Sequence, residues 1–348
     1  MATSKTILVI GGAGYVGGIL VPKLLGAGYT VRVLDLFIYG RKVFDQIRPN
    51  DHLIEIEGDI RDAEVLSDTI QGCDAIIHLA AYLGVRRTEI NPLRCLEINI
   101  TGTKNMVEFS KQFEVERFVL VSTDKAVRPV NVMGATKRVA EQVIQSVDPG
   151  GKTVFLAVRF GNVIGSSGSV IPIFKKQVEK GGPVTITHPE MTRYFMSIPE
   201  ASQLILQAGA VGKQGQVFLL DMGEPIRIKD MAFDLIRLSG FEPEKDIPVI
   251  YTGLRPGEKL YEELYGRSEQ IIKTDFDKLM ILNDTGSQKS WKFLSDQIEE
   301  IVVCAEELNS ESIKRGLKKM IPDYNPQTEM YSEDYPEDLR QYAIRGEA

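Results

Sequence analysis

Side chains that bind metal ions are scarce in this chain, whose 348 residues include 3 cysteines and 3 histidines. The cysteines are Cys73, Cys95 and Cys304, and the histidines are His52, His78 and His188. Neither set has the close spacing that metal ligands need, and an odd number of cysteines does not make a disulfide framework. We therefore expect no metal site, and free thiols in a reducing compartment.

Long apolar runs and basic blocks are also missing. No run approaches the ~20 apolar residues that span a membrane, and the N-terminus lacks the apolar core and cleavage site of a signal peptide. The formal net charge is -7 and lysine and arginine form no cluster, so nucleic acid is not an expected partner. These absences predict a cytoplasmic protein without a membrane segment, and its length suffices for two lobes.

What the sequence does contain begins with a strand, a glycine turn and a helix. An apolar run at residues 6–10 precedes the string GGAGYVG at residues 11–17, and helical periodicity continues to Leu25. Glycines let the backbone approach a pyrophosphate, whose charge is favoured at the N-terminus of a helix. A second expected strand, residues 29–34, ends in Asp35, whose carboxylate would accept the hydroxyls of an adenosine ribose. Helix capping or a solvated loop acid is the alternative reading of Asp35.

Asp35 favours NAD over NADP, because a carboxylate repels a 2′-phosphate. Arg41 and Lys42 lie a few residues further on and could offset that repulsion. The expected cofactor is therefore NAD, with NADP as the alternative.

Strands and helices continue to alternate through the first half of the chain. Strands are expected at 53–57, 75–79, 117–122 and 153–160, with helices near 62–71 and 97–113. This alternation predicts an α/β fold, a Rossmann doubly wound parallel sheet over residues 1–165 whose strand ends line the cofactor crevice. The cofactor-binding residues that we expect are Gly11, Gly14, Tyr15, Val16, Gly17, Asp35, Asp59, Ile60, Leu79, Ala80, Ala81, Asn99 and Lys137. Those at 59–60 and 79–81 could equally be turn and packing residues.

The organisation changes after about residue 161. Helices are expected at 170–180, from Pro199 and at 228–238, strands at 184–187 and 216–220, and only amphipathic helices after Lys259, near 290–308 and 311–319. We expect a smaller, discontinuous substrate lobe over 166–330, with later segments returning to the Rossmann domain. Residues 331–348 form a polar tail that we expect to be poorly packed.

The strand expected at 117–122 is followed by titratable residues. Thr123, Asp124 and Lys125 come directly after it, and Met133 and Lys137 are one helical turn apart further on. The thioether of Met133 cannot act as an acid or a base. Asp124 and Lys125 are therefore the obvious candidates for an acid and a base. Helix capping by Thr-Asp and core packing by methionine are the alternatives.

From residue 117 to about 263 the chain resembles the polysaccharide-biosynthesis branch of the extended short-chain dehydrogenases, in particular the UDP-N-acetylglucosamine 4,6-dehydratases of bacillosamine and pseudaminate pathways. The matching strings are STDKAV, NVMGATKR, RFGNVIGSSGSVIPIFKKQ, GGPVTITHPEMTRYFMSIPEA, LDMGEPIRIKDMA and GLRPGEKLYEEL. Short-chain dehydrogenases usually carry tyrosine where this chain has Met133. Members of this group with tyrosine invert carbon 5 of the sugar, whereas those with methionine retain its configuration. Many of the latter carry an N-terminal transmembrane region, which this sequence lacks.

The resemblance implies a lyase that keeps NAD tightly bound and recycles it within each turnover. Oxidation at carbon 4 acidifies the proton on carbon 5, and water then leaves from carbon 6. Asp124 would be the acid at carbon 6 and Lys125 the base at carbon 5, with Thr123 as a relay and Lys137 holding the nicotinamide ribose. Lys125 can be the base only if its pKa is depressed, which we expect from a pocket of low dielectric constant, from Lys137 and from oxidised nicotinamide.

The expected partner is a UDP-sugar, bound within a homo-oligomer. Guanidinium groups match phosphate oxygens, so Arg193 and Arg255 are candidates for the diphosphate, with Glu258 for a ribose. The substrate-binding residues that we expect are Asn162, Val170, Thr185, Thr187, Arg193, Arg255 and Glu258. For any single arginine, a surface ion pair is the alternative.

Three other functions are compatible with the sequence. A sugar-nucleotide 4-epimerase is favoured by the loop at 82–92, which resembles the epimerases, but is opposed by the absent tyrosine. A dehydratase that inverts carbon 5 is the second. A non-catalytic sensor of the cofactor is the third, and Asp124, Lys125 and Lys137 argue against it because a sensor would not need them.

Overall fold

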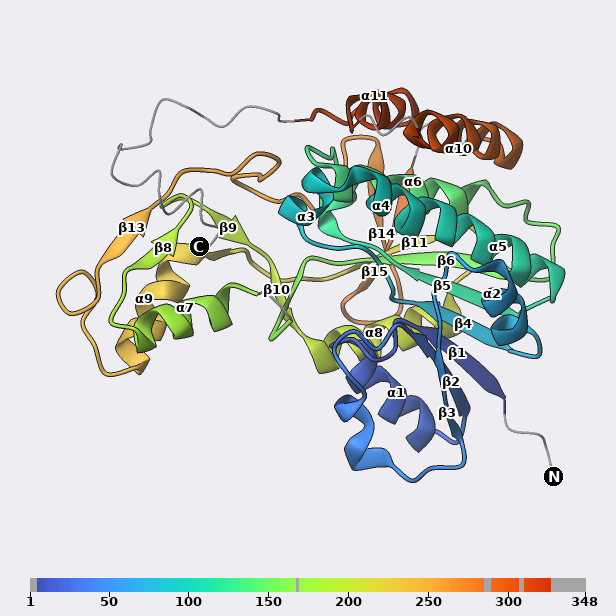
Figure 1. The fold of residues 1–348 in the computed structure, drawn as a ribbon, viewed down its shortest axis with the longest axis horizontal. Coiled ribbons are helices and arrows are strands. Elements are labelled where there is room, and N and C mark those ends of the chain that lie inside the picture. Colours follow the sequence, from blue (N-terminus) through green and yellow to red (C-terminus); the bar gives the residue numbers. More distant parts are fainter. Residues whose placement is uncertain (1–4, 167–168, 285–288, 307–309, 327–348) are drawn as a thin grey trace.

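The computed structural model describes residues 5–166, 169–284, 289–306 and 310–326, and a single large sheet dominates it (Figure 1). Its 9 strands lie in the order β14 (Glu269–Lys273), β15 (Leu279–Asp284), β11 (Val217–Leu220), β6 (Val154–Arg159), β5 (Arg117–Val121), β4 (Ala75–His78), β1 (Thr6–Ile10), β2 (Thr30–Asp35) and β3 (Leu53–Glu57). Neighbours from β11 to β3 are parallel, whereas β15 and β14 join antiparallel. The chain therefore starts in the middle of the sheet and winds outwards both ways, which confirms the predicted doubly wound fold.

The central strands read as unbroken apolar runs because both faces of the sheet are buried. In β1, Leu8 and Ile10 belong to one core, whereas Ile7 and Val9 belong to the other. The first core lies under α2 (Ala63–Ile70), α4 (Pro92–Leu96), α5 (Gly102–Gln112) and α6 (Val132–Ser146), and the second under α1 (Gly17–Gly26) and α8 (Ile198–Val211). The site is therefore expected at the carboxyl edge of this sheet.

A smaller lobe stands to one side of the sheet in Figure 1 and has its own core. It contains α7 (Val170–Glu179), β8 (Val184–Ile186), β9 (Thr192–Arg193), β12 (Ile226–Arg227), α9 (Ile228–Leu238) and β13 (Val249–Tyr251). Parallel strands β7 (Asn162–Ile164) and β10 (Phe195–Ser197) lie where the two parts meet. The sequence predicts α9 to the residue.

Two sequence expectations need correction. After Lys259 the chain is not only helical, because β14 and β15 form an antiparallel hairpin at the sheet edge. Exposed Ile271 and Ile272 are consecutive, so β14 lacks the alternation that marks a half-buried strand. The expected loop at 82–92 contains the short helix α3 (Val85–Ile90). The helix expected near 97–113 is present, and its first turn, Glu97–Thr101, is π-helical. The predicted tail at 331–348 lies outside the described residues.

Two C-terminal helices cover the α6 side of the sheet (Figure 1). These helices, α10 (Trp291–Glu306) and α11 (Ser310–Met320), contribute Leu294, Ile298 and Leu317 to the same core as α6. Lys314 of α11 pairs with Glu89 of α3 at 3.0 Å, and Glu89 in turn accepts a hydrogen bond from the backbone N–H of Val132, the first residue of α6. The C-terminal helices therefore hold the start of α6, although they follow the sheet in sequence.

A buried ionic network joins the strands and helices behind the carboxyl edge. Arg159 of β6 is fully buried and pairs with Glu141 of α6 at 2.7 Å and with Glu269 of β14 at 2.8 Å. Ser122 donates to Glu141 at 2.6 Å, and Arg138 pairs with both acids. Burial alone would raise the pKa of Glu141, but Arg159 and Arg138 lower it to about 2. The ionised Glu141 carboxylate thus stabilises the fold at any pH above the ordinary pKa of a glutamate, and this stabilisation is lost as the pH falls towards 2.

Arg159→Met should destabilise the protein by about 3–5 kcal/mol, because it leaves two buried carboxylates without their main partner. Urea denaturation at neutral pH measures this change. The matched control is Lys152→Met, which breaks the Lys152–Glu114 pair, whose side chains are 72% and 57% exposed. That variant should differ from the wild type by at most about 1 kcal/mol. Equal stability of the two variants would contradict the role given to the network.

Candidate active site

The glycine turn after β1 packs tightly against the backbone at the edge of the sheet. A Cβ atom on Gly11, whose φ is +78°, would lie 2.6 Å from the backbone nitrogen of Ala80, and one on Gly17 would lie 2.2 Å from the carbonyl oxygen of Gly12. Only glycine fits at either position. The backbone nitrogens of Leu79 and Ala80 both donate to the carbonyl of Ile10, so the loop after β4 runs beside the turn.

Asp35 lies at the end of β2, next to this turn. Its carboxylate accepts hydrogen bonds from the backbone nitrogens of Ala13 at 2.9 Å and Phe37 at 2.8 Å. The residues predicted from the glycine turn are therefore brought together with those after β2 and β4. They are Gly11, Gly14, Tyr15, Val16, Gly17, Asp35, Leu79, Ala80 and Ala81.

The other predicted cofactor residues occupy different surroundings. Asp59 is paired with Arg61 at 2.7 Å, and the Ile60 side chain is buried in the core. Asn99 bridges the protein itself, since its amide exchanges two hydrogen bonds with the backbone of Tyr82 and donates to Thr136. These contacts mean that Asn99 fixes the loop after β4 against α6.

The carboxyl end of β5 positions Thr123 and Asp124. The backbone N–H of Ser122 donates to the carbonyl of Val158 in β6, and that of Asp124 donates to the carbonyl of Phe160, the residue after β6. Asp124 is fully buried; its Oδ1 accepts from the Thr123 hydroxyl at 3.0 Å, and its Oδ2 is buried without a hydrogen-bond partner in the described structure. A buried carboxylate oxygen with no donor is costly, and such atoms occur at functional sites.

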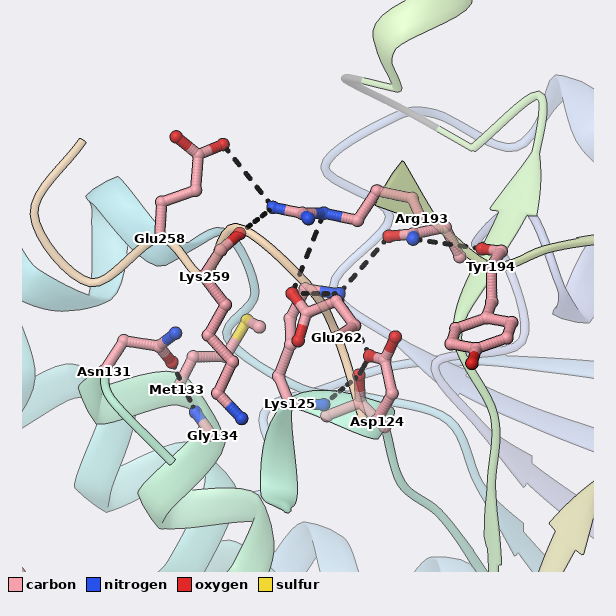
Figure 2. Close-up of polar contacts among 12 residues, drawn as sticks. Asp124, Lys125, Asn131, Met133, Gly134, Arg193, Tyr194, Glu258, Lys259 and Glu262 are labelled. Atoms are coloured by element: carbon pink, nitrogen blue, oxygen red, sulfur yellow. Dashed lines mark hydrogen bonds and ion pairs between the residues drawn. The ribbon is translucent and has the colours of Figure 1, made fainter. Parts of the chain in front are cut away.

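Lys125 lies between two carboxylates, as Figure 2 shows. Its Nζ is 3.0 Å from Asp124 Oδ1 and 3.7 Å from Glu262 Oε1, and it donates to Asn162 Oδ1 at 3.3 Å. Burial lowers the pKa of Lys125, but the charges of Asp124 and Glu262 raise it further, so the net shift is upwards. The expectation of a depressed Lys125 pKa is therefore wrong, and Lys125 rests as an ammonium group.

Met133 and Lys137 lie on the first turns of α6, as predicted. Asn131 caps this helix by accepting from the backbone nitrogen of Gly134, and Met133 Sδ accepts from that of Gly84 at 3.2 Å. Met133 and Lys137 are 5% and 4% exposed, and burial lowers the pKa of Lys137 to about 8. Met133 thus lies near Lys125 and Asp124 (Figure 2) without an acidic proton of its own.

The smaller lobe contributes Arg193 to the same cluster. Its guanidinium donates to the backbone carbonyls of Thr192, Lys259 and Leu260 and pairs with Glu258 at 3.8 Å and Glu262 at 3.7 Å. Arg193 therefore fixes the segment that carries Glu262 over Lys125.

The remaining predicted substrate residues are spread over the lobe. Asn162 joins the cluster because its side chain accepts a hydrogen bond from Lys125 and donates one to the carbonyl of Tyr194. Val170 is the first residue of α7, and the Thr185 hydroxyl accepts a hydrogen bond from the side-chain amide of Gln177. A cavity of about 990 Å³ lies beside the cluster and is lined by Thr187, Tyr251, Leu254, Glu258 and Lys259, among others. Arg255 is exposed, one residue from this cavity.

Glu262 is the main residue of this cluster that is not among the site residues predicted from the sequence. It falls within the matching string GLRPGEKLYEEL, but nothing in that string distinguishes it from Glu263. The structure does, because the Glu262 side chain is 4% exposed and the Glu263 side chain 34%.

Comparison with known proteins assigns the family. The family model described as "Polysaccharide biosynthesis protein" matches residues 7–284. The chain belongs to this family. It is 50% identical over 292 residues to the capsular polysaccharide biosynthesis protein CapD of Staphylococcus aureus, a match that covers 80% of this chain and 48% of CapD. The chain thus spans about half the length of that relative.

Solved structures of short-chain dehydrogenase type share the fold. Pen from Bacillus thuringiensis has a TM-score of 0.75 and 31% identity, over 84% of this chain and 90% of Pen. DesIV, a dTDP-glucose 4,6-dehydratase of Streptomyces venezuelae solved with NAD and TYD bound, has a TM-score of 0.67 and 25% identity, over 75% of this chain and 88% of DesIV. This chain therefore has the Rossmann fold of these proteins.

Two negative findings apply to the described ranges. None of their helices has both the length and the hydrophobicity needed to cross a bilayer. Nor do they gather three or more histidine, cysteine or acidic residues in a way that could hold a metal ion.

Gly134→Ala should destabilise the protein by about 1–3 kcal/mol, the usual cost of overpacking. Its Cβ would lie 2.0 Å from the carbonyl oxygen of Lys125, so α6 and the Lys125 turn would have to separate. Urea denaturation measures the change. Gly26→Ala is the control, since its Cβ would meet nothing within 4 Å and alanine is the better helix former. An equally stable Gly134→Ala variant would show that this close approach is not needed.

Proposed function

We propose that this family member is a nucleotide-sugar 4,6-dehydratase that acts on UDP-N-acetylglucosamine and retains the configuration of carbon 5. The observation that carries the proposal is the ion pair between fully buried Asp124 and partly buried Lys125 at the end of β5, close to a methionine and Lys137 on α6. Dehydration needs an acid and a base within reach of adjacent carbons. The likeness to DesIV, a 4,6-dehydratase by its description, supports the reaction class.

The residues around the glycine turn fit NAD. The turn from Gly11 to Gly17 has the tight backbone packing that a pyrophosphate site needs, and Asp35, which bonds this turn at Ala13, would accept the ribose hydroxyls. Arg41 stacks on Phe37 at 3.7 Å and is paired with Glu55 and Glu57, so its charge is already balanced. That arrangement favours NAD over NADP. When bound, NAD would accept a hydride from carbon 4 and return it to carbon 6.

The chain's own residues would move the protons. The Thr123 hydroxyl, which donates to Asp124, would relay the proton of the carbon 4 hydroxyl to that carboxylate. Asp124 would then protonate the hydroxyl that leaves from carbon 6, and Lys125 would remove and return the proton on one face of carbon 5. Lys137, with its pKa of about 8, would hold the nicotinamide ribose.

Arg255 and Arg193 would bind the diphosphate, with Glu258 at a ribose. Arg193 is already held by backbone carbonyls, so Arg255, which is exposed beside the cavity, would contribute more of the phosphate contact. Thr185, Thr187, Asn162 and Val170 remain candidates for the rest of the substrate.

The direct test is incubation of the purified protein with UDP-N-acetylglucosamine in heavy water without added reductant. A product lighter by one water, with one deuterium on carbon 5 and unchanged configuration by nuclear magnetic resonance, is expected. An isobaric product would show epimerisation, an inverted carbon 5 would show the other class of dehydratase, and no turnover would favour a sensor.

Asp124→Asn and Lys125→Ala should each slow dehydration by about two orders of magnitude or more, the scale typical of losing a general acid or base. NAD binding, followed by the rise in melting temperature that it causes, should persist in both variants. Near-normal turnover in either one would remove that residue from its role.

Met133→Leu should remain largely active, because no proton passes through the thioether and the volumes are similar. Its expected defect is loss of the weak contact with Gly84. Met133→Tyr should fold and bind NAD but handle the oxidised sugar differently, since a phenol adds an acid and base near carbon 4. Steady-state rates with melting curves measure both. Inactive Met133→Leu with an unchanged melting temperature would contradict the assignment of proton transfer to Asp124 and Lys125.

A further inference from the structure

Glu262 is a buried carboxylate with one oxygen unused. Its side chain is 4% exposed, and Oε1 lies 3.7 Å from both Lys125 Nζ and Arg193 Nε. Oε2 is buried and has no hydrogen-bond partner in the described structure. Leaving such an oxygen without a donor costs stability, so a role in function is the natural explanation for its retention.

A count of protons assigns that role, given the proposed function. Two protons must be placed before carbon 5 can be attacked. One leaves the carbon 4 hydroxyl and reaches Asp124 through Thr123; the other is already on Lys125, which rests as an ammonium group between two carboxylates. Asp124 must keep the first proton in order to act as the acid at carbon 6. The second proton therefore needs another acceptor, and Glu262 is the other carboxylate beside Lys125.

We propose that Glu262 accepts the proton of Lys125 and so makes the amine available as the base. An N–H bond of Lys125 breaks and an O–H bond forms on Glu262. The neutral amine takes the proton of carbon 5, while Asp124 gives its proton to the departing hydroxyl, which leaves as water. Lys125 later returns the proton to carbon 5 and recovers its own from Glu262, so all three groups end as they began.

The surrounding charges suit this exchange. Lys125 interacts electrostatically with Asp124, Glu262, Arg193 and the phenol of Tyr15. Asp124 already holds the carbon 4 proton when Lys125 gives up its own, and moving that second proton to Glu262 leaves the net charge of the cluster unchanged. The distance of 3.7 Å is longer than a hydrogen bond, and catalytic contacts commonly shorten when the substrate binds.

Glu262→Gln tests the proposal, with Glu263→Gln as the matched control. Both substitutions remove one carboxylate from the same segment, but Glu263 pairs with Arg128 and Lys259 and does not contact Lys125. The measurements are kcat and KM from pH 6 to 10 and the absorbance of reduced nicotinamide in a single turnover.

Glu262→Gln should lower kcat at neutral pH by about 100-fold with little change in KM. Its kcat should rise about tenfold per pH unit as solvent replaces the missing acceptor. Oxidation at carbon 4 uses Thr123 and Asp124 but not Glu262, so reduced nicotinamide should form and accumulate. A residue that merely supports the fold would not produce that combination. Glu263→Gln should keep the wild-type profile, and Glu262→Asp, whose carboxylate lies further from Lys125, should lose at least about tenfold in kcat.

Wild-type kcat and pH profile in Glu262→Gln would overturn the proposal. If that variant does not fold, wild-type kcat in Glu262→Asp would overturn it instead. Absence of dehydration by the unmodified protein would show that the proposed function is wrong, an outcome distinct from failure of the Glu262 assignment.

Discussion

The guanidinium of Arg159, buried between Glu141 and Glu269, is the interaction on which the site depends. It ties β6 to α6 and β14, and Glu141 extends the tie to β5 through Ser122. Three of these elements, β5, β6 and α6, have a site residue within a few positions of the network. Asp124 follows Ser122 by two residues, Asn162 follows Arg159 by three, and Lys137 precedes Glu141 by one helical turn. Charges buried this deeply are expensive, and their geometry fixes the relative position of strand ends more strictly than apolar packing would.

The cluster above this network needs both parts of the molecule. Asp124 and Lys125 come from the sheet, whereas Arg193 and Glu262 arrive with the smaller lobe and the segment behind it. Arg193 holds three backbone carbonyls, so the lobe sets the position of Glu262 through main-chain contacts. Movement of the lobe would therefore change the charge environment of Lys125 as well as access to the crevice.

What the sequence predicts well is local. The glycine turn, Asp35 and the run from Thr123 to Lys137 are close in sequence, and the strand and helix periods place them on one edge of the sheet. The protonation state of Lys125 could not be predicted, because Glu262 lies 137 positions away and only packing brings it near. The hairpin of β14 and β15 could not be predicted for a different reason, because its outer strand, β14, is exposed and shows no alternation of apolar and polar residues. Asn99 is predicted to bind the cofactor, but in the structure its amide is used by Tyr82 and Thr136, which periodicity alone does not reveal.

The C-terminal helices show that a family boundary need not be a folding boundary. The family match ends at residue 284, before α10 and α11, but these helices complete the core over α6, and Lys314 holds Glu89 against its first backbone nitrogen. The residues that the family model matches thus rely on helices beyond that match for the solvent exclusion and orientation of α6. Transplanting residues 7–284 alone into another scaffold would require an equivalent apolar cover and an equivalent cation. Without them, the helix that carries Met133 and Lys137 would begin at a surface open to water.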